Sequence, residues 1–473
     1  MSTLSTSKSD YLIEHENYAN WDVNLGDKTV HARRIPGKFR SIKWLIMGIL
    51  LVPFFLAPYL TWGERQAIYF DIPGRKFYLF DITVWPQDLI ILALLMLFAF
   101  ILLFAMTAIA GRIFCGNICP QTLWTDLMTL TERWAEGSAR QRIKLDAMPW
   151  NAEKIRKKTF KHLMWITICT VTSVTFLGYF SGIYNAWTGL FTLNYNIFEW
   201  ASFVSVFILF YVSTGFVREQ VCNWICPYAR IQAVMTDKDT VTTTYDYHRG
   251  EKRGRMKKGQ VDDSLGDCVD CNLCVSVCPT GVDIREGNQI GCINCGVCID
   301  ACDDIMGKVG RDKGLIRFMS YHELESKTET KNRFLRPRPI FYMLVTTVTF
   351  VAIMYSLLFK SDIDMNVNHE RSPTYTLMSD RTIQNVFHAI ILNKAENAAN
   401  FTLKATGIDG IKSNYDNKTL KLTSGQAKKI TIRIKIPQKN LSSERQPITL
   451  KLQSIDNPEL SKTYESMFFG PKR

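Results

Sequence analysis

Five apolar stretches without a charged side chain interrupt an otherwise charged sequence. A helix needs about 20 apolar residues to cross a bilayer, and each stretch is close to that length. Buried helices of a large soluble core are the alternative, but five uncharged stretches of this length favour an α-helical membrane domain. The predicted spans are Leu45–Trp62, Leu89–Ala110, Leu163–Phe180, Ala201–Val217 and Ile340–Phe359.

The pattern after the last apolar stretch changes to alternation of apolar and polar positions. Residues 430–436 read Ile-Thr-Ile-Arg-Ile-Lys-Ile, and residues 420–423 and 448–452 alternate in the same way. Alternation with a period of two is typical of half-buried strands. With weaker runs between them, about seven short strands in roughly 100 residues predict an all-β, immunoglobulin-like sandwich.

Lysine and arginine are distributed unevenly around the apolar stretches. The formal net charge of +13 is compatible with nucleic-acid binding, but the basic residues crowd beside the spans, so we expect a membrane and no nucleic acid as partner. Ten basic residues lie in 111–162 and nineteen in 218–339, against three in 63–88 and none in 181–200. The positive-inside rule therefore predicts a cytoplasmic N-terminus, and five crossings place the tail outside.

Eight of the thirteen cysteines form a double ferredoxin pattern. Residues 268–302 contain C-x2-C-x2-C-x3-C-P followed by C-x2-C-x2-C-x3-C. In bacterial two-cluster ferredoxins the fourth cysteine of each run ligates the other cluster. Structural zinc usually takes two separated pairs, and cytosolic thiols stay reduced, so zinc and disulfides fit less well. The predicted [4Fe–4S] ligands are Cys268, Cys271, Cys274 and Cys302 for cluster 1, and Cys292, Cys295, Cys298 and Cys278 for cluster 2.

Two Cys-x3-Cys-Pro motifs follow the second and fourth apolar stretches and are offset by 107 residues. This repeat predicts that residues 42–217 consist of two two-helix hairpins, the second closed by a tight turn over 181–200. Both motifs are expected at the membrane surface that faces the ferredoxin segment. The motif residues are Cys115 and Cys119, preceded by Arg112, and Cys222 and Cys226, preceded by Arg218.

The two thiols of each motif are predicted to share one helix face, because residues i and i+4 have Cβ atoms about 6 Å apart. Soft thiolates select Cu(I), zinc or an iron–sulfur cluster, and the preceding arginines are expected to lower the thiol pKa. A disulfide within each pair and buried, inert thiols stay open as alternatives. Cys169 stands alone in the third apolar stretch, where we expect it to pack as a small hydrophobe.

The predicted organisation is a multi-domain membrane protein with five spans. No histidine lies inside an apolar stretch to ligate a membrane haem, and no Gly-rich nucleotide-binding loop occurs. The predicted domains are a cytoplasmic N-terminal segment (1–41), a four-helix membrane domain (42–217), a cytoplasmic ferredoxin-like α+β module with two clusters (218–339), a fifth transmembrane helix (340–360) and a periplasmic immunoglobulin-like domain (361–473).

This combination of spans, paired Cys-x3-Cys-Pro motifs, double ferredoxin and β-sandwich tail resembles the accessory proteins of cbb3-type cytochrome c oxidase, the CcoG/FixG family. The likeness covers almost the whole chain after residue 30. The paired motifs also look like those of the membrane ferredoxins of periplasmic nitrate reduction, and the sandwich tail favours the oxidase accessory proteins. One departure is Asp303, which replaces the proline after Cys302 but would ligate nothing.

The resemblance implies a bacterial inner-membrane protein that reduces Cu(II) to Cu(I) for oxidase assembly, that is, a cupric reductase. The ferredoxin module would take electrons from a cytosolic donor, and Cys115, Cys119, Cys222 and Cys226 would bind or reduce copper. The tail would dock oxidase subunits or copper-delivery and assembly factors. An electron-transfer subunit linking quinol or a cytosolic donor to another respiratory reductase, and a redox-sensing scaffold, stay open. So does the oligomeric state, a homodimer included.

Overall fold

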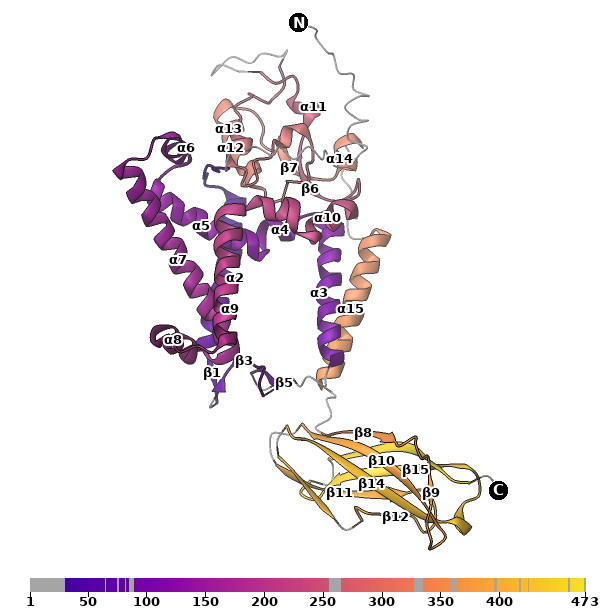
Figure 1. Ribbon diagram of the computed structural model, residues 1–473. Coiled ribbons are helices and arrows are strands. Elements are labelled where there is room, and N and C mark those ends of the chain that lie inside the picture. Colours follow the sequence, from indigo (N-terminus) through magenta and orange to yellow (C-terminus); the bar gives the residue numbers. More distant parts are fainter. Residues whose placement is uncertain are drawn as a thin grey trace. The chain divides into compact units, whose positions relative to one another are not determined.

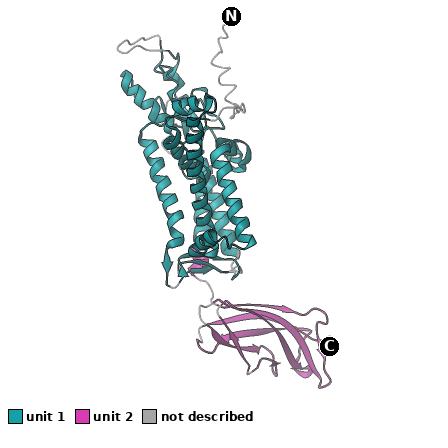
Figure 2. Ribbon diagram, turned by 60° about the vertical axis from the view of Figure 1, so that its left-hand side comes forward, with its two compact units in different colours: residues 1–353 teal, residues 354–473 magenta. Residues whose placement is uncertain are grey.

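The computed structural model divides into two compact units, Met1–Ile353 and Met354–Arg473 (Figure 2). The first unit contains the membrane helices and the ferredoxin module, and the second contains the β-rich tail. Residues 1–29, most of the predicted N-terminal segment, lie outside the described residues. The structure describes residues 30–471 except 64, 75, 81, 85–88, 255–264, 327–334, 359–362, 395–397, 417, 424 and 458–459.

The described residues contain five helices that are long and apolar enough to cross a membrane, as the hydrophobic pattern predicts (Figure 1). The first and third begin seven and eleven residues before the predicted stretches, because their basic first turns are also helical. Long basic side chains at a helix end can reach out of the hydrocarbon layer. The five are α2 (Lys38–Leu56), α3 (Leu89–Ala110), α7 (Ala152–Ser181), α9 (Ile197–Phe210), which continues into the π-helix η2 (Tyr211–Val217), and α15 (Pro337–Leu358).

The connection between α7 and α9 is not the tight turn that the sequence predicts. A further helix, α8 (Ile183–Thr192), folds back onto α7, where Ile183 and Ala186 pack against Val174 and Leu177. The apolar face of this ten-residue segment explains why it forms a helix against α7. The connection between α2 and α3 also contains short strands, β1 (Thr61–Trp62), β2 (Arg65–Gln66), β3 (Ile68–Asp71), β4 (Lys76–Leu79) and β5 (Ile82–Val84).

The first two spans pack with different partners, whereas the repeat suggested that they form one hairpin. Met47 and Leu51 of α2 pack against Leu123 and Trp124 of α5 (Pro120–Glu136). Helix α3 instead lies beside α15, where the rings of Phe98 and Phe350 are 5.9 Å apart (Figure 1). Apolar side chains on both faces of these helices make either pairing compatible with the hydrophobic pattern.

The ferredoxin module forms at the ends of these helices, around a small sheet and two short helices. Strand β6 (Thr242–Tyr245) pairs antiparallel with β7 (Ile316–Met319). The helices α12 (Leu273–Val277) and α13 (Val297–Val309) each follow a cysteine-rich loop. Its apolar core includes Ile284, Ile299, Met306, Leu315 and Ile316.

The second unit is a sandwich of two antiparallel sheets, so the predicted all-β tail is confirmed. One sheet has the order β12-β14-β10-β8, with β9 paired to β10, and the other has the order β13-β11-β15-β16. The alternating isoleucines of β14 point inward, as their pattern predicts. The strands are β8 (Ile363–His369), β9 (Thr376–Leu377), β10 (Thr382–Asn393), β11 (Ala399–Thr406), β12 (Lys412–Ser413), β13 (Thr419–Leu422), β14 (Ala427–Pro437), β15 (Arg445–Ser454) and β16 (Ser461–Phe469).

Candidate redox centres

The first predicted set of four cysteines lines a single cavity in the ferredoxin module. Cys268 and Cys271 come from the loop that leads into α12, Cys274 comes from α12 itself, and Cys302 comes from α13. Burial is the largest cause that raises the pKa of Cys302 to about 12, and the nearby thiols of Cys274 and Cys268 raise it further. The fourth cysteine of the second run therefore lies with the first three of the first run, as the crossed ferredoxin pattern requires.

The second predicted set is brought together in the same crossed way. Burial is the main cause that raises the pKa of Cys298, and the next causes are Cys295, Cys292 and Cys278. Burial also raises the pKa of Cys292 to about 12, and Cys278 again contributes. Cys278, which ends the first run, thus lies beside the three cysteines of the second run.

The backbone of both loops has the sharp turns that wrapping a cluster requires. Asp270, Asn272 and Asn294 have left-handed backbone conformations, and Gly296 has a φ of 72° directly after Cys295. Among the described residues no three Cys, His, Asp or Glu side chains converge tightly enough to hold one metal ion. Each set supplies four thiols, which is the number of cysteine ligands that a [4Fe–4S] cluster takes. When bound, [4Fe–4S] clusters supply one-electron redox chemistry.

A buried arginine stands beside the first set. Arg285 is 7% exposed, lines the same cavity, and its guanidinium contacts Asp283 at 2.6 Å and Asp270 at 2.6 Å. These carboxylates hold the pKa of Arg285 well above its ordinary value. The arginine therefore stays charged and places positive charge next to Cys274. The position of Arg285 in the sequence does not indicate that it lies beside this cysteine set.

The four thiols of the Cys-x3-Cys-Pro motifs do not lie on continuous helices, which corrects the expectation of a shared helix face. Cys115 is in the short helix α4 (Ile113–Asn117), and Cys119 is the N-cap of α5. Cys222 is in the π-helix η3 (Val221–Ile225), and Cys226 is the N-cap of α10 (Pro227–Met235). The proline after each second cysteine explains the break, because it occupies the first helical position.

All four thiols nevertheless lie close enough to influence one another. Burial raises the pKa of Cys222 to about 12, and the other three thiols are among the further causes. Burial also raises the pKa of Cys115 to about 11, and Cys119 and Cys226 contribute. Two motifs 107 residues apart thus form one group of four sulfur atoms, which we call the four-thiol site.

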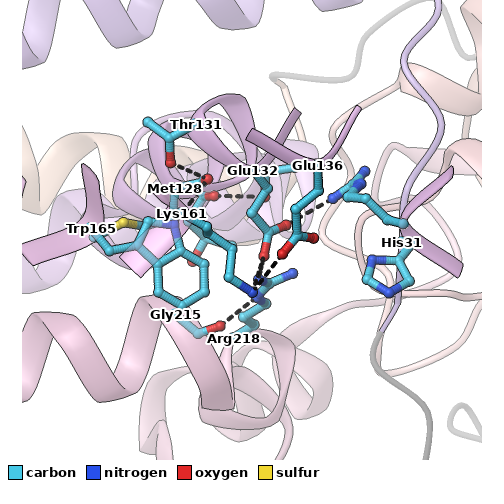
Figure 3. Close-up of polar contacts among 12 residues, drawn as sticks. His31, Met128, Thr131, Glu132, Glu136, Lys161, Trp165, Gly215 and Arg218 are labelled. Carbon is cyan, nitrogen blue, oxygen red and sulfur yellow. Dashed lines mark hydrogen bonds and ion pairs between the residues drawn. The ribbon is translucent and has the colours of Figure 1, made fainter. Parts of the chain in front are cut away.

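The two arginines that precede the motifs have different roles, and the expectation that they lower the thiol pKa below its ordinary value is wrong. Arg112 opposes the rise in the pKa of Cys115, but burial outweighs it. Arg218 points elsewhere: its guanidinium contacts the buried carboxylate of Glu132 and donates to the carbonyl of Gly215 at 2.8 Å (Figure 3). The same carboxylate contacts Arg142 at 2.8 Å, so Arg218 belongs to a buried ionic network.

Comparisons with known proteins match both cysteine groups and the tail. A family profile described as "4Fe-4S dicluster domain" matches residues 217–321, one described as "4Fe-4S binding domain" matches 92–135, and one described as "IG-like fold at C-terminal of FixG" matches 353–471. Protein RdxB of Cereibacter sphaeroides is 39% identical over 389 residues, 80% of this chain and 82% of the relative. The nitrogen fixation protein FixG of Rhizobium meliloti is 33% identical over 417 residues, 80% of each chain. The chain belongs to the FixG family.

Membership of the FixG family identifies an iron–sulfur electron-transfer protein with membrane helices and an immunoglobulin-like tail. Protein RdxA of Cereibacter sphaeroides is a further relative, 37% identical over 398 residues, 82% of this chain and 84% of the relative. The profile over 92–135 includes the first Cys-x3-Cys-Pro motif, and the profile over 217–321 includes the second.

In this FixG-family chain the second cysteine set of the ferredoxin module rests directly on the four-thiol site. A Cβ added to Gly116, between Cys115 and Cys119, would overlap the carbonyl oxygen of Ile293 and lie 3.0 Å from the Cα of Cys295. Arg112 donates a hydrogen bond to the carbonyl of Ile290. Only glycine permits this close backbone approach, and no local sequence pattern indicates it.

The ferredoxin module also caps a membrane helix. The carboxylate of Asp300 in α13 accepts hydrogen bonds from the backbone amides of Phe39 at 3.2 Å and Arg40 at 2.9 Å, in the first turn of α2. A carboxylate at a helix N-terminus satisfies free amides and opposes the helix dipole. In the same helix Lys43 lies near Cys295, so α2 contributes positive charge to the second set.

The remaining polar contacts of the four-thiol site come from buried uncharged groups. The thiol of Cys115 donates to the side-chain oxygen of Gln232 at 3.0 Å, and Gln232 donates to Thr107 at 3.1 Å. Gln232 lies in α10, directly after the second motif, so it joins the two motifs. Cys169 is fully buried beside Met128 and Trp165, which agrees with the packing role expected for it.

Proposed function

We propose that the chain takes electrons from a cytosolic donor and delivers them to the four-thiol site, where Cu(II) is reduced to Cu(I) for assembly of a cbb3-type oxidase. In this proposal the N-terminus and the ferredoxin module face the cytoplasm of a bacterial inner membrane, and the tail faces the periplasm. The tail would dock oxidase subunits or copper-delivery factors. The proposed cluster ligands are the two crossed sets described above.

The observation that carries the proposal is the contact between the second cysteine set and the first Cys-x3-Cys-Pro motif. The backbone around Gly116 touches that of Ile293 and Cys295, with no side chain between them. Electron transfer needs short distances between donor and acceptor sites. A ferredoxin module that acted only on a soluble partner would not require its cysteine loop to be seated on a second group of thiols.

The chemistry of the four-thiol site suits copper as a substrate. Soft thiolates stabilise Cu(I) relative to Cu(II), which favours transfer of one electron from the reduced module to copper. Burial raises the pKa of Cys115 to about 11, so this thiol is protonated at neutral pH when it binds no metal. Binding Cu(I) would therefore release protons, while Arg112 and the N-termini of α5 and α10 favour the resulting thiolates.

A single-turnover experiment tests this proposal. The purified full-length protein is reduced with dithionite under anaerobic conditions, excess reductant is removed, and Cu(II) is added with a Cu(I)-specific chelator. We expect the visible absorption of the clusters to return while Cu(I) appears in proportion. The Cys115→Ser/Cys222→Ser variant should lose this reaction, and Cys169→Ala is the matched control. Clusters that stay reduced, or a double variant that behaves like the parent, would exclude the copper reaction.

A second candidate function is electron transfer to another respiratory reductase without copper chemistry. It is favoured by two observations on the four-thiol site: the thiols do not converge on a single ion among the described residues, and a "4Fe-4S binding domain" profile covers the first motif. In this case the four thiols would hold a further cluster. Iron analysis separates the two functions, since a further cluster adds four iron atoms per chain, and these are lost in Cys115→Ser/Cys222→Ser.

A further inference from the structure

A cavity of about 190 Å³ lies between the ferredoxin module and the ends of the membrane helices. Its walls come from the segment before α2, the first turns of α2, helices α5 and α6 (Ala139–Ala147), and the loops that carry the second cysteine set. No step of the proposed copper reaction uses this cavity. Six arginines line it, Arg33, Arg34, Arg40, Arg133, Arg142 and Arg218, together with one carboxylate, Asp126.

The positive charge of this cavity exceeds the negative charge that faces it. The single carboxylate of Glu132 is shared by Arg142 and Arg218. Asp126 is shared between Lys43 at 2.9 Å and Arg40 at 3.9 Å. For Arg33, Arg34 and Arg133, the described part of the chain provides no carboxylate within 4.0 Å. Partial burial and then the neighbouring Arg40 and Arg133 lower the pKa of Arg34, which reflects this crowding of like charges.

Buried hydrogen-bond donors at the cavity also lack acceptors. The Nε atoms of Arg40 and Arg142 and the indole nitrogen of Trp44 are buried without a hydrogen-bond partner. Arg142 is only 3% exposed, and all three residues line the cavity. Unsatisfied buried donors are rare in folded proteins, and a bound anion is one way to satisfy them.

We propose that this cavity binds a phosphate-bearing anion. Planar guanidinium groups match phosphate oxygens in geometry and charge, and arginine is the preferred residue for such sites. Val277, Pro279 and Val297 also line the cavity, and each of them is next to Cys278 or Cys298 in the sequence. The bound anion would therefore lie against the second cysteine set. The phosphate can belong to a lipid headgroup or to a soluble compound, because the chemistry of recognition is the same.

Titration calorimetry on the full-length protein in detergent without added lipid tests the proposal. The probes are pyrophosphate and the short-chain lipid dihexanoylphosphatidylglycerol. The test variant is Arg34→Gln/Arg133→Gln, since neither side chain forms an ion pair with a described residue. The control is Arg156→Gln, an exposed position of α7 outside the cavity.

We expect the parent and the control to bind at least one probe, and the double variant to bind it at least about tenfold more weakly, the effect of losing charge-assisted hydrogen bonds. Preference for the lipid would assign the site to a headgroup, and preference for pyrophosphate would assign it to a soluble anion. The proposal is overturned if the parent binds neither probe, or if the double variant binds as tightly as the control.

Discussion

The two Cys-x3-Cys-Pro motifs share a backbone plan but lie in different surroundings. In both, the first cysteine is in a short helical turn, and the second caps a helix that begins with proline. The first motif is covered by the ferredoxin loop at Gly116, and Arg112 faces the thiols. The second motif follows Arg218, which is held in the ionic network of Glu132.

This difference indicates that the repeat has been divided between two tasks. The first copy provides the contact with the ferredoxin module, and the second copy is fixed to the helix bundle. Both still contribute thiols to one site. Substitutions around the first motif should therefore impair electron delivery or copper binding, and substitutions around the second motif should lower stability.

Removing the carboxylate that anchors the second motif should have the largest effect on stability. In Glu132→Ala, Arg142 and Arg218 would be left buried without their shared partner. Breaking a buried ion pair in this way costs about 3–5 kcal/mol of unfolding free energy. Thermal unfolding followed by circular dichroism should show this loss as a lower unfolding temperature. The control is Glu153→Ala, because Glu153 forms an exposed ion pair with Lys157. Equal unfolding temperatures for both variants would contradict the anchoring role.

Adding one methyl group to the first motif should impair electron delivery. In Gly116→Ala the new Cβ would meet the backbone of Ile293 and Cys295, which cannot rotate away. Because the two backbones would have to move apart, the redox groups would lie farther from each other, and we expect severalfold slower reoxidation of the reduced module by Cu(II) in stopped-flow absorption. The matched control is Gly48→Ala in α2, where an added Cβ meets no atom within 4 Å. Equal rates in the two variants would argue against the direct contact.

Substitution of Arg112 should affect Cu(I) affinity, whereas substitution of Arg218 should affect stability. Arg112→Gln removes the positive charge that faces the thiols, and we expect about tenfold weaker Cu(I) binding in competition with a chelator. Arg218→Gln should leave Cu(I) affinity within about twofold of the parent but lower the unfolding temperature. The reverse pattern would mean that the second arginine, not the first, serves the thiols.

The smallest effect is expected for the residue that joins the motifs. Gln232→Leu removes the acceptor of the Cys115 thiol and the donor to Thr107. Because a typical hydrogen bond contributes about 1 kcal/mol, the unfolding free energy should fall by about that amount. Denaturant unfolding measures it. A loss as large as that of Glu132→Ala would give Gln232 a structural role beyond this contact.

Features encoded by local periodicity were predictable from the sequence, and features made by distant residues were not. Runs of apolar residues predicted the five membrane helices, and alternation predicted the β-sandwich. Cysteine spacing predicted which thiols lie together, while their ligation of clusters stays a prediction.

The contacts that the sequence could not indicate join residues far apart in the chain. Asp300 caps a helix that begins more than 250 residues earlier, and Gly116 matters only because Ile293 lies against it. Arg218, which precedes the second motif in the sequence, pairs with the buried Glu132, a residue 86 positions earlier in the chain. Local patterns carry no information about such partners.

The most direct test of the central claim, one four-thiol site fed by the ferredoxin module, compares single cysteine variants from the two motifs. Dithionite-reduced Cys115→Ser and Cys222→Ser are mixed separately with Cu(II), and reoxidation of the clusters and formation of Cu(I) are followed together by stopped-flow absorption. If the four thiols act as one site, both variants should lose the reaction to a similar extent while Cys169→Ala retains it. Full activity in either single variant would contradict a shared site.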